Sequence, residues 1–420
     1  MVKVTRRSVT AGAGLFALGM AGKASAQPAT VKIGVIYPLS GNAASAGNYS
    51  KMASELGAEI VNNGNAELAK FLPFVSPTGG LPGLKGAKIQ VVTADNQGTP
   101  AAGANQTLRL ITQEKVVAVV GSYQSGITET ASAIAEKYGI PFLTPESVAA
   151  NLTERGFKWF FRTTPVAGDF ARAYADFLKE QKAGGKKVDS IAIIHENTEY
   201  GNSVSSVIAD TFKKDGLNVS QNISYSANST DVQPQVLQLK EKNPDVAIFI
   251  SYTSDAILYT KTMKEQNWKP SILIADDAGF NDPKYVKEMG SQVEGLISRT
   301  SFGVGKPGSV SAICDALYKK KTGGDGLDDT SGRGLQGFFT LVDAINRAGS
   351  TEPAKIQAAL KATDLKQDQM VAGYKGVKFD AKGQNTLASS IIVQMKGGQY
   401  VPVWPKANAT AELVLPYKGW

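Results

Sequence analysis

The sequence predicts an α/β protein whose strands form two mostly parallel sheets, and three observations support this fold class. Short apolar segments alternate with amphipathic helical windows from Val31 onward. Several of these segments are apolar on successive residues, which is typical of strands covered on both faces. The alternation is interrupted near residues 157–170, where the sequence "FKWFFRTTPVAGDF" indicates a crossing between two lobes.

The predicted strands are short runs rich in β-branched residues, and helical windows separate them. In "GITETASAIAEKYG", residues Ile127, Ala131, Ile134, Ala135 and Tyr138 fall on one face of a helix. Parallel strands joined by such helices require right-handed crossovers. The predicted strands are 31–37, 88–94, 116–121, 140–144, 190–195, 245–251 and 271–276.

The second half of the chain predicts further crossings. A strand in "GLISRTSFG" (295–303) leads into Gly- and Pro-rich sequence, helices dominate from Ser309 to Ala362, and antiparallel strands follow around a Gly397-Gly398 turn. We therefore expect both lobes to be discontinuous. The predicted ranges are 28–164 plus 300–365 for lobe 1 and 165–299 plus 366–420 for lobe 2.

The first 26 residues predict a cleaved export signal. They contain the Arg6-Arg7 pair, the short apolar run "AGAGLFALGMAG" and the small-residue site Ala24-Ser25-Ala26. The arginine pair resembles a twin-arginine signal, although Val9 stands where Phe is usual. We expect a periplasmic protein, and the arginine pair suggests the twin-arginine route of export.

Composition excludes several functional classes. The chain has 420 residues and a formal net charge of +8. Four of its basic residues, Lys3, Arg6, Arg7 and Lys23, lie in the predicted signal. The remaining basic residues are too dispersed to indicate nucleic-acid binding. After the N-terminus no run of about 20 apolar residues predicts a membrane span.

Ligands of parallel α/β sheets collect at the carboxyl ends of the strands, beside helix N-termini. The sequence brings small, polar and aromatic residues to that edge, but no phosphate-binding loop of the Walker or dinucleotide type. We therefore expect a small-molecule ligand and no cofactor. The predicted edge segments are 38–47, 122–126, 144–151, 195–201, 251–255 and 275–280.

A secreted hydrolase or amidase using Ser125 and His195 is the alternative hypothesis. "GSYQSG" lacks the G-x-S-x-G spacing of a nucleophile elbow, and His195 is the only histidine and thus the only imidazole base. One histidine and one cysteine do not supply a structural zinc site, so no metal is expected. Since the catalytic arrangement is incomplete, we expect a protein that is not an enzyme.

The same edge residues suit ligand binding with fewer requirements. Ser125 precedes a helical window, where its hydroxyl can cap the helix or contact a ligand carboxylate. Tyr200 and Tyr252 combine an apolar ring with a hydroxyl group. Asp277 can accept from an ammonium or N–H group, or can end a turn.

These segments resemble a known family. "VKIGVIYPLSGNAASAG", "VVGSYQSGITETASAIAEKYGIPFLTPESVAANLT", "FFRTTP" and "IAIIHENTEYGNS" are similar to periplasmic solute-binding proteins of ABC importers, in particular the leucine/isoleucine/valine-binding branch. The resemblance covers nearly the whole chain after the signal. It implies two Rossmann-like lobes joined by a three-stranded hinge, the type I periplasmic binding fold. It also implies capture of a small ligand without chemical conversion, delivery to a membrane permease, and a monomer.

The resemblance also implies the site residues. Ser125 corresponds to the serine that grips the amino-acid carboxylate, Asp277 to the carboxylate that meets the α-ammonium, and Tyr200 and Tyr252 to aromatic positions of the far lobe. Ala46 corresponds to a bulky aromatic of the leucine binder.

The neighbouring ligand loop contains the second departure from the family. Glu146 and Val148 fall on this loop, and Val148 replaces the usual threonine hydroxyl. Ser147 beside them and Tyr123 in the Ser125 loop complete the candidate ligand-binding residues. The losses at Val148 and Ala46 weaken the case for an ordinary α-amino acid, so larger acids, aromatic acids and amides join branched-chain amino acids as candidate ligands.

Overall fold

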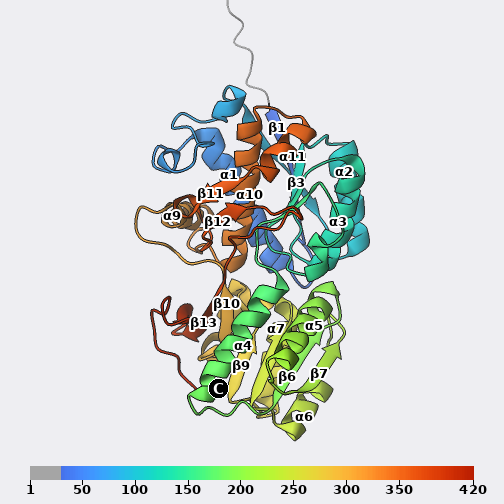
Figure 1. Cartoon of the computed structure of the whole chain (residues 1–420), viewed down its shortest axis with the longest axis vertical. Helices are drawn as coiled ribbons and strands as arrows, with labels where there is room; N and C mark the ends of the chain where they lie inside the picture. The colour runs from blue at the N-terminus through green and yellow to red at the C-terminus, as the bar shows by residue number, and fades with distance from the viewer. Residues whose placement is uncertain (1–29) are drawn as a thin grey trace, which may run out of the picture.

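The computed structural model describes residues 30–420, which form two lobes stacked along the long axis of the molecule (Figure 1). The predicted export signal and its twin-arginine pair lie outside the described residues. No helix in the described part of the chain is long and apolar enough to cross a membrane.

The first lobe is built on a five-stranded, fully parallel sheet in the order β2-β1-β3-β4-β5. Its strands are β1 (Thr30–Tyr37), β2 (Lys88–Asp95), β3 (Ala118–Gly121), β4 (Phe142–Thr144) and β5 (Phe160–Arg162). Its helices are α1 (Ala44–Asn63), α2 (Pro100–Thr112), α3 (Ser125–Tyr138), α9 (Val310–Thr322), α10 (Asp329–Ala348) and α11 (Pro353–Lys361).

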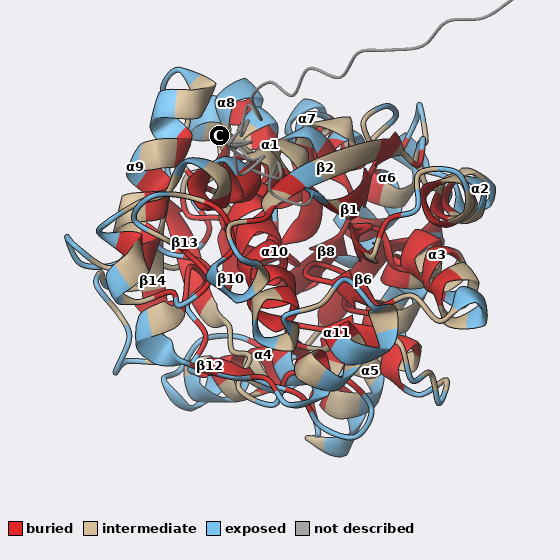
Figure 2. Ribbon diagram, turned by 90° about the horizontal axis from the view of Figure 1, so that it is seen from above, coloured by how far each residue is buried: buried red, intermediate tan, exposed pale blue. Residues whose placement is uncertain are grey.

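Both faces of this sheet are covered, which explains the continuous apolar runs of its strands. Ile36 and Val119 pack in a cluster with residues of α2 and α3. Their neighbours Val35 and Val120 point the other way, into the core formed with α1 and α10. Burial of successive residues is the expected consequence of this three-layer arrangement, and Figure 2 shows buried residues along β1.

The second lobe contains a seven-stranded sheet in the order β14-β13-β10-β9-β8-β6-β7. The last two strands of the chain add to it antiparallel, and its other strand pairs are parallel. Its strands are β6 (Ile191–Glu196), β7 (Val219–Tyr225), β8 (Val246–Ile250), β9 (Ile272–Ala275), β10 (Ile297–Thr300), β13 (Ile391–Lys396) and β14 (Gln399–Trp404). Its helices are α4 (Ala167–Ala183), α5 (Glu199–Lys214), α6 (Gln233–Lys242), α7 (Thr253–Glu265) and α8 (Pro283–Met289).

The strand predictions are confirmed at all seven positions, and so are the helices between Ser309 and Ala362 and the antiparallel C-terminal pair. Three strands were not predicted: β5, β7 and the three-residue β11 (Asp364–Lys366). β7 is a sheet edge in which exposed and partly buried residues alternate, so it lacks an apolar run. β5 has only three residues and lies inside the stretch interpreted as a crossing.

The chain passes between the two sheets between β5 and α4, after β10, and before β13. The segment between the last two crossings includes a two-stranded sheet of β11 (Asp364–Lys366) and β12 (Gly376–Lys378). Gln369 Nε2 donates to Phe71 O at 3.1 Å, and the Asn385 N–H donates to Arg162 O at 2.9 Å. These contacts favour placing residues 367–385 with the first lobe; the lobe boundaries themselves stay a prediction.

Candidate functional site

The carboxyl ends of the two sheets face each other across a small enclosed cavity. It is lined by residues of both lobes and has a volume of about 20 Å³. Seven of the nine predicted ligand-binding residues line it. The lining residues are Tyr123, Ser125, Glu146, Val148, Tyr200, Tyr252, Asp277, Ala278, Arg299 and Arg333.

Ser147 and Ala46 do not line this cavity. The Ser147 hydroxyl is buried among the first-lobe loops, 2.6 Å from Thr128 Oγ1, and donates to Tyr123 O at 2.9 Å. Ser147 therefore holds the Tyr123 loop in place. Ala46 lies in the first turn of α1, where it is 1% exposed and packs in the core. Direct ligand contact at these two positions stays a prediction.

Ser125 is the first residue of α3, and Gln124 occupies the N-cap position without a side-chain capping bond. The interpretation of Ser125 as a helix cap is therefore wrong. Its hydroxyl accepts from the Ala149 N–H at 3.3 Å and so links two loops that reach the cavity. In the first turn of a helix, backbone N–H groups have no partner within the helix and carry a partial positive charge, which favours an anionic group.

Tyr123 extends from a constrained loop. Its φ of 79° is in the left-handed region, and a Cβ on Gly121 (φ 141°) would lie 2.0 Å from Ile36 O. Left-handed backbone in a non-glycine residue is uncommon and concentrates at functional sites. The Tyr123 hydroxyl is buried without a hydrogen-bond partner.

Three tyrosines form an aromatic wall between the lobes. The Tyr123 and Tyr252 ring centroids are 5.9 Å apart, and those of Tyr252 and Tyr200 are 5.3 Å apart. The Tyr200 hydroxyl donates to Asp276 O at 2.7 Å and approaches Asp276 Oδ2 at 3.0 Å. This wall gives the cavity an apolar side suited to a hydrocarbon or aromatic group.

A buried network of two arginines and three aspartates borders the same cavity. Arg299 Nε lies 2.8 Å from Asp276 Oδ1, and Arg299 Nη1 lies 3.1 Å from Asp277 Oδ2. Arg333 Nη2 lies 2.8 Å from Asp277 Oδ2 and 2.7 Å from Asp329 Oδ2. Isolated charges at this depth are costly, and mutual pairing reduces the cost.

Asp277 is engaged on both oxygens by protein groups. Besides the two guanidinium groups at Oδ2, its Oδ1 accepts from Asn281 Nδ2 at 3.0 Å. Burial and the nearby Asp329 carboxylate raise the pKa of Asp277 to about 7. For Asp329, burial favours a higher pKa, but Arg333 and the hydrogen bonds from Thr300 and Ser301 outweigh it and lower the pKa. The predicted contact of Asp277 with a ligand ammonium stays a prediction, and it faces competition from both arginines.

Glu146 presents two different oxygens. Its Oε1 accepts from Tyr37 OH at 3.0 Å and from Ser50 Oγ at 3.3 Å, whereas Oε2 is buried with no partner. Burial raises the pKa of Glu146 to about 8, against the opposing charge of Arg333. The carboxyl group is therefore mostly protonated at neutral pH.

The described residues do not form a Ser-His catalytic arrangement. His195 Nδ1 lies 3.0 Å from Glu196 O within β6, and His195 does not line the cavity. The described hydrogen bond of the Ser125 hydroxyl is with Ala149. Burial lowers the pKa of His195. In the part of the chain that the structure describes, no group of His, Cys, Asp and Glu residues is arranged to hold a metal ion.

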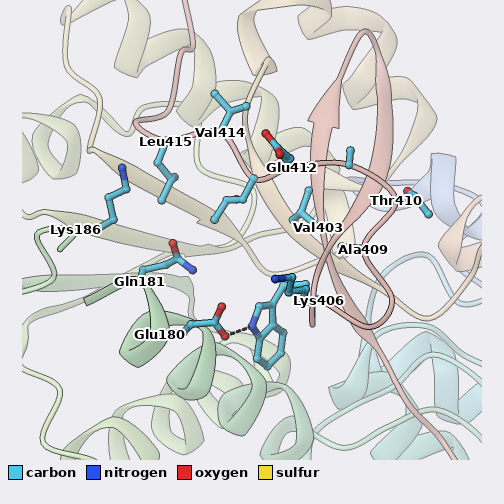
Figure 3. Close-up of a pocket in the computed structure, with 13 residues that line it drawn as sticks. Glu180, Gln181, Lys186, Val403, Lys406, Ala409, Thr410, Glu412, Val414 and Leu415 are labelled. Carbon is cyan, nitrogen blue, oxygen red and sulfur yellow. Dashed lines mark hydrogen bonds between the residues drawn. The ribbon is translucent and has the colours of Figure 1, made fainter. Parts of the chain in front are cut away.

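A larger and more open hollow of about 780 Å³ lies on the second lobe, between the end of α4 and the segment after β14 (Figure 3). Among the residues that line it, Glu180 Oε2 accepts from the Trp404 indole N–H at 2.8 Å. Lys186 and Lys406 are also among the residues that line it. It lacks the enclosed polar groups of the cavity between the lobes, which remains the candidate site.

Comparison with known proteins places the chain in a family. A family model described as periplasmic binding protein matches residues 30–399. The chain belongs to the periplasmic binding protein family. Leu/Ile/Val-binding protein homolog 7 of Brucella abortus is 32% identical, with 96% of this chain and 99% of that protein covered. The resemblance inferred from sequence is thereby confirmed, and the chain is a solute-binding protein of this family.

Solved structures share the fold. The leucine-binding protein LivK of Thermotoga maritima superposes with a TM-score of 0.74 at 22% identity, covering 88% of this chain and 97% of that one. A solute-binding protein of an ABC transporter from R. palustris, solved with benzoate, has a TM-score of 0.74 at 19% identity, covering 93% of this chain and 99% of that one. The predicted two-lobed fold with mostly parallel sheets is confirmed.

The sequence interpretation missed Arg299 and Arg333. Both were placed in segments interpreted only as a crossing and a helix. A signal was present, because Arg333 is the only charged residue in the stretch "SGRGLQGFF" of a helix that is almost wholly buried. Fully buried arginines are rare unless they are paired.

Proposed function

We propose that the protein is the extracytoplasmic substrate-binding component of an ABC importer and captures a small carboxylate or amino-acid-like ligand between its lobes. The observation that carries this proposal is the cavity enclosed by both lobes, which combines an aromatic wall, the N-terminus of α3 and buried polar groups. Such a site binds by enclosure and provides no complete catalytic arrangement, so we propose a binding protein rather than an enzyme.

The cavity is too small to admit a ligand unless the two lobes move apart. A volume of about 20 Å³ accommodates about one water molecule. An amino acid or an aromatic acid therefore enters only when the lobes separate, and it holds them further apart than in this closed conformation. The three connections between the sheets suit such a hinge motion. A monomer that exchanges between free and permease-bound forms fits this cycle.

The candidate ligands differ in their demands on the site. The relatives carry leucine/isoleucine/valine names, and the structural neighbours include proteins solved with leucine, benzoate and 3,4-dihydroxybenzoic acid. In this chain the aromatic wall and Val148 favour an apolar or aromatic body. The first turn of α3 and the Ser125 hydroxyl are placed to meet a carboxylate.

Calorimetry and thermal-shift measurements on the mature chain test the proposal. The panel contains branched-chain amino acids, aliphatic and aromatic carboxylates, and their amides. We expect a member of the panel to raise the unfolding temperature, because a ligand that binds only the folded state stabilises it. Mass spectrometry of the protein incubated with that ligand should recover the ligand unchanged.

Ser125→Ala supplies the site-specific control. Loss of the hydroxyl should weaken binding by about 1–3 kcal/mol, whereas Ser203→Ala, at a contact between the lobes outside the cavity, should have a smaller effect. Absence of binding by every member of the panel, or turnover of the ligand, would contradict the proposed function.

A further inference from the structure

Glu146 places a buried carboxyl group in the wall of the cavity between the lobes. It follows β4 in the first lobe, is 4% exposed, and lines the cavity directly. A buried carboxyl group must be neutralised by a cation or by a proton. The surroundings of Glu146 show which of the two applies.

Arginine does not neutralise this carboxyl group by direct contact. Arg333 Nη1 donates to the backbone oxygen of Glu146 at 3.3 Å and to Thr164 Oγ1 at 3.2 Å. Arg333 Nη2 is engaged by Asp277 and Asp329, and its Nε donates to Asp329 O at 3.3 Å. The guanidinium group thus fixes the loop of Glu146 while its charge is shared by two aspartates.

The remaining groups that face Glu146 are hydroxyls and the Asp329 carboxylate. Tyr37 on β1 and Ser50 on α1 donate to Oε1. Asp329 on α10 opposes ionisation, and the buried Tyr374 hydroxyl, which follows β11, lies close enough to sense the same charge. With Oε1 accepting two hydrogen bonds, the proton of the neutral acid resides on Oε2.

Oε2 then carries a buried donor without an acceptor. An unsatisfied buried donor destabilises the closed state until a partner accepts from it. The Tyr123 hydroxyl lines the same cavity and also has no partner. A ligand oxygen satisfies such donors, and a carboxylate oxygen is the strongest acceptor of this kind.

The opposite requirement, an uncompensated carboxylate for a ligand ammonium, is not met at Asp277. Arg333 Nη2 donates to Oδ2, Asn281 Nδ2 donates to Oδ1, and the Arg299 guanidinium lies 3.1 Å from Oδ2. An ammonium group brought to this site would meet the repulsion of two buried guanidinium groups.

We propose that Glu146 determines the specificity of the site: in its protonated form it donates a hydrogen bond through Oε2 to an oxygen of a ligand carboxylate, and the ligand carries no α-ammonium group. This inference rests on the proposed solute-binding function and narrows its ligand to a small monocarboxylate with an apolar or aromatic body.

Calorimetry with two matched pairs of probes tests the inference. 4-Methylpentanoate and leucine differ only by the α-ammonium group, as do phenylacetate and phenylglycine. We expect the acid of a pair to bind at least about tenfold more tightly than its amino acid, because only the amino acid brings an unpaired buried ammonium. Its dissociation constant should rise toward about tenfold per pH unit above pH 8, where Glu146 loses its proton.

Three variants separate the donor role from a structural one. Glu146→Gln keeps a donor in place of Oε2, since Tyr37 and Ser50 orient the amide oxygen toward themselves. Affinity at pH 7 should stay within a few-fold, and the rise in the dissociation constant above pH 8 should disappear. Glu146→Leu removes the donor and should weaken binding about tenfold or more. Asp255→Asn removes another buried acid with a raised pKa outside the cavity and should leave both quantities unchanged.

The outcomes that contradict the role of Glu146 differ from those that contradict the proposed function. Tighter binding of the amino acids, affinity that increases with pH, or a Gln variant as weak as the Leu variant overturns the role of Glu146 while leaving the solute-binding proposal intact. Failure of all four probes and of the wider ligand panel, with the protein folded, contradicts both proposals. Binding of amides alone overturns the carboxylate assignment only.

Discussion

Arg333 Nη2 and Asp277 Oδ2 lie 2.8 Å apart, and this ion pair joins the first lobe to the second across the cavity. Arg333 projects from α10, whereas Asp277 follows β9 of the opposite lobe. Both side chains are nearly inaccessible to solvent. The closed conformation therefore depends on a charge contact that must separate when the lobes open.

Replacement of this arginine should both destabilise and open the protein. In Arg333→Met, Asp277 keeps only Arg299 as a cationic partner and Asp329 loses its arginine. Breaking a buried pair by removal of one partner costs about 3–5 kcal/mol. Chemical denaturation should show this loss, and small-angle scattering should show a larger radius of gyration.

Arg347→Met is the matched control for Arg333→Met. Arg347 lies on the same helix and pairs with Asp343 four residues before it, but its side chain is 35% exposed and the pair lies within one lobe. Because the change also leaves the buried Asp343 without its arginine and removes the bonds to Ala359 O and Thr363 Oγ1, we expect a loss of about 1–3 kcal/mol but an unchanged radius of gyration. Equal effects of the two variants would show that the contact between the lobes has no special role.

The stability of the protein should carry a pH dependence that originates from Glu146. Its pKa is raised from 4.5 to about 8 in the folded state, so the folded protein holds this proton more tightly than the unfolded chain. The resulting stabilisation is complete below pH 4.5 and is lost as the pH rises through 8.

Denaturation of wild type and Glu146→Gln between pH 5 and 9 measures this contribution. As the pH rises from 5 to 9, the free energy of unfolding of the variant should increase relative to that of the wild type by an amount on the order of 3 kcal/mol. Burial raises the pKa of Asp255 to about 6. The free energy of unfolding of Asp255→Asn should therefore increase less relative to the wild type, and the increase should level off at a lower pH. A constant difference between wild type and Glu146→Gln would indicate that Glu146 is ionised when the protein folds.

The hydroxyl of Tyr200 should contribute to stability independently of its ring. Tyr200→Phe removes the donor that contacts Asp276 O at 2.7 Å and keeps the aromatic packing against Tyr252. Loss of a buried hydrogen bond of this kind costs about 1–2 kcal/mol. Tyr138→Phe, at a position 45% exposed, should leave the free energy of unfolding unchanged within error. Identical values for the two variants would contradict the assigned role.

The close approach of α5 to β6 should make Gly201 intolerant of a side chain. A Cβ at this position would lie 1.9 Å from Glu196 O, so Gly201→Ala must displace the helix and should cost more than about 2 kcal/mol. Gly168, near the start of α4, has only Val166 Cγ2 at 4.0 Å. Gly168→Ala should be neutral or stabilising by up to about 1 kcal/mol, because alanine favours the helix. A mild Gly201→Ala phenotype in thermal denaturation would refute this prediction.

Much of the fold is determined by local sequence. Apolar runs such as those of β3 and β8 are buried on both faces, so periodicity and length sufficed to predict them. β7 escaped prediction because an edge strand needs no continuous apolar face, and its position depends on pairing with β6. Strand ends also placed Ser125 at the carboxyl edge of the first sheet and Tyr200, Tyr252 and Asp277 at that of the second, since parallel strands deliver their following loops to the same side of a sheet.

Sequence alone thus determined the two-lobed α/β fold, the family, and most of the residues that line the cavity. Only the tertiary structure determined which ion pairs and hydrogen bonds those residues form. Arg299 and Arg333 reach Asp277 from positions 22 and 56 residues away, and Glu146 meets Tyr37 and Ser50 from distant elements. Ionisation and hydrogen bonding of a buried group depend on its neighbours in space, and these contacts exist only after the lobes have folded and closed.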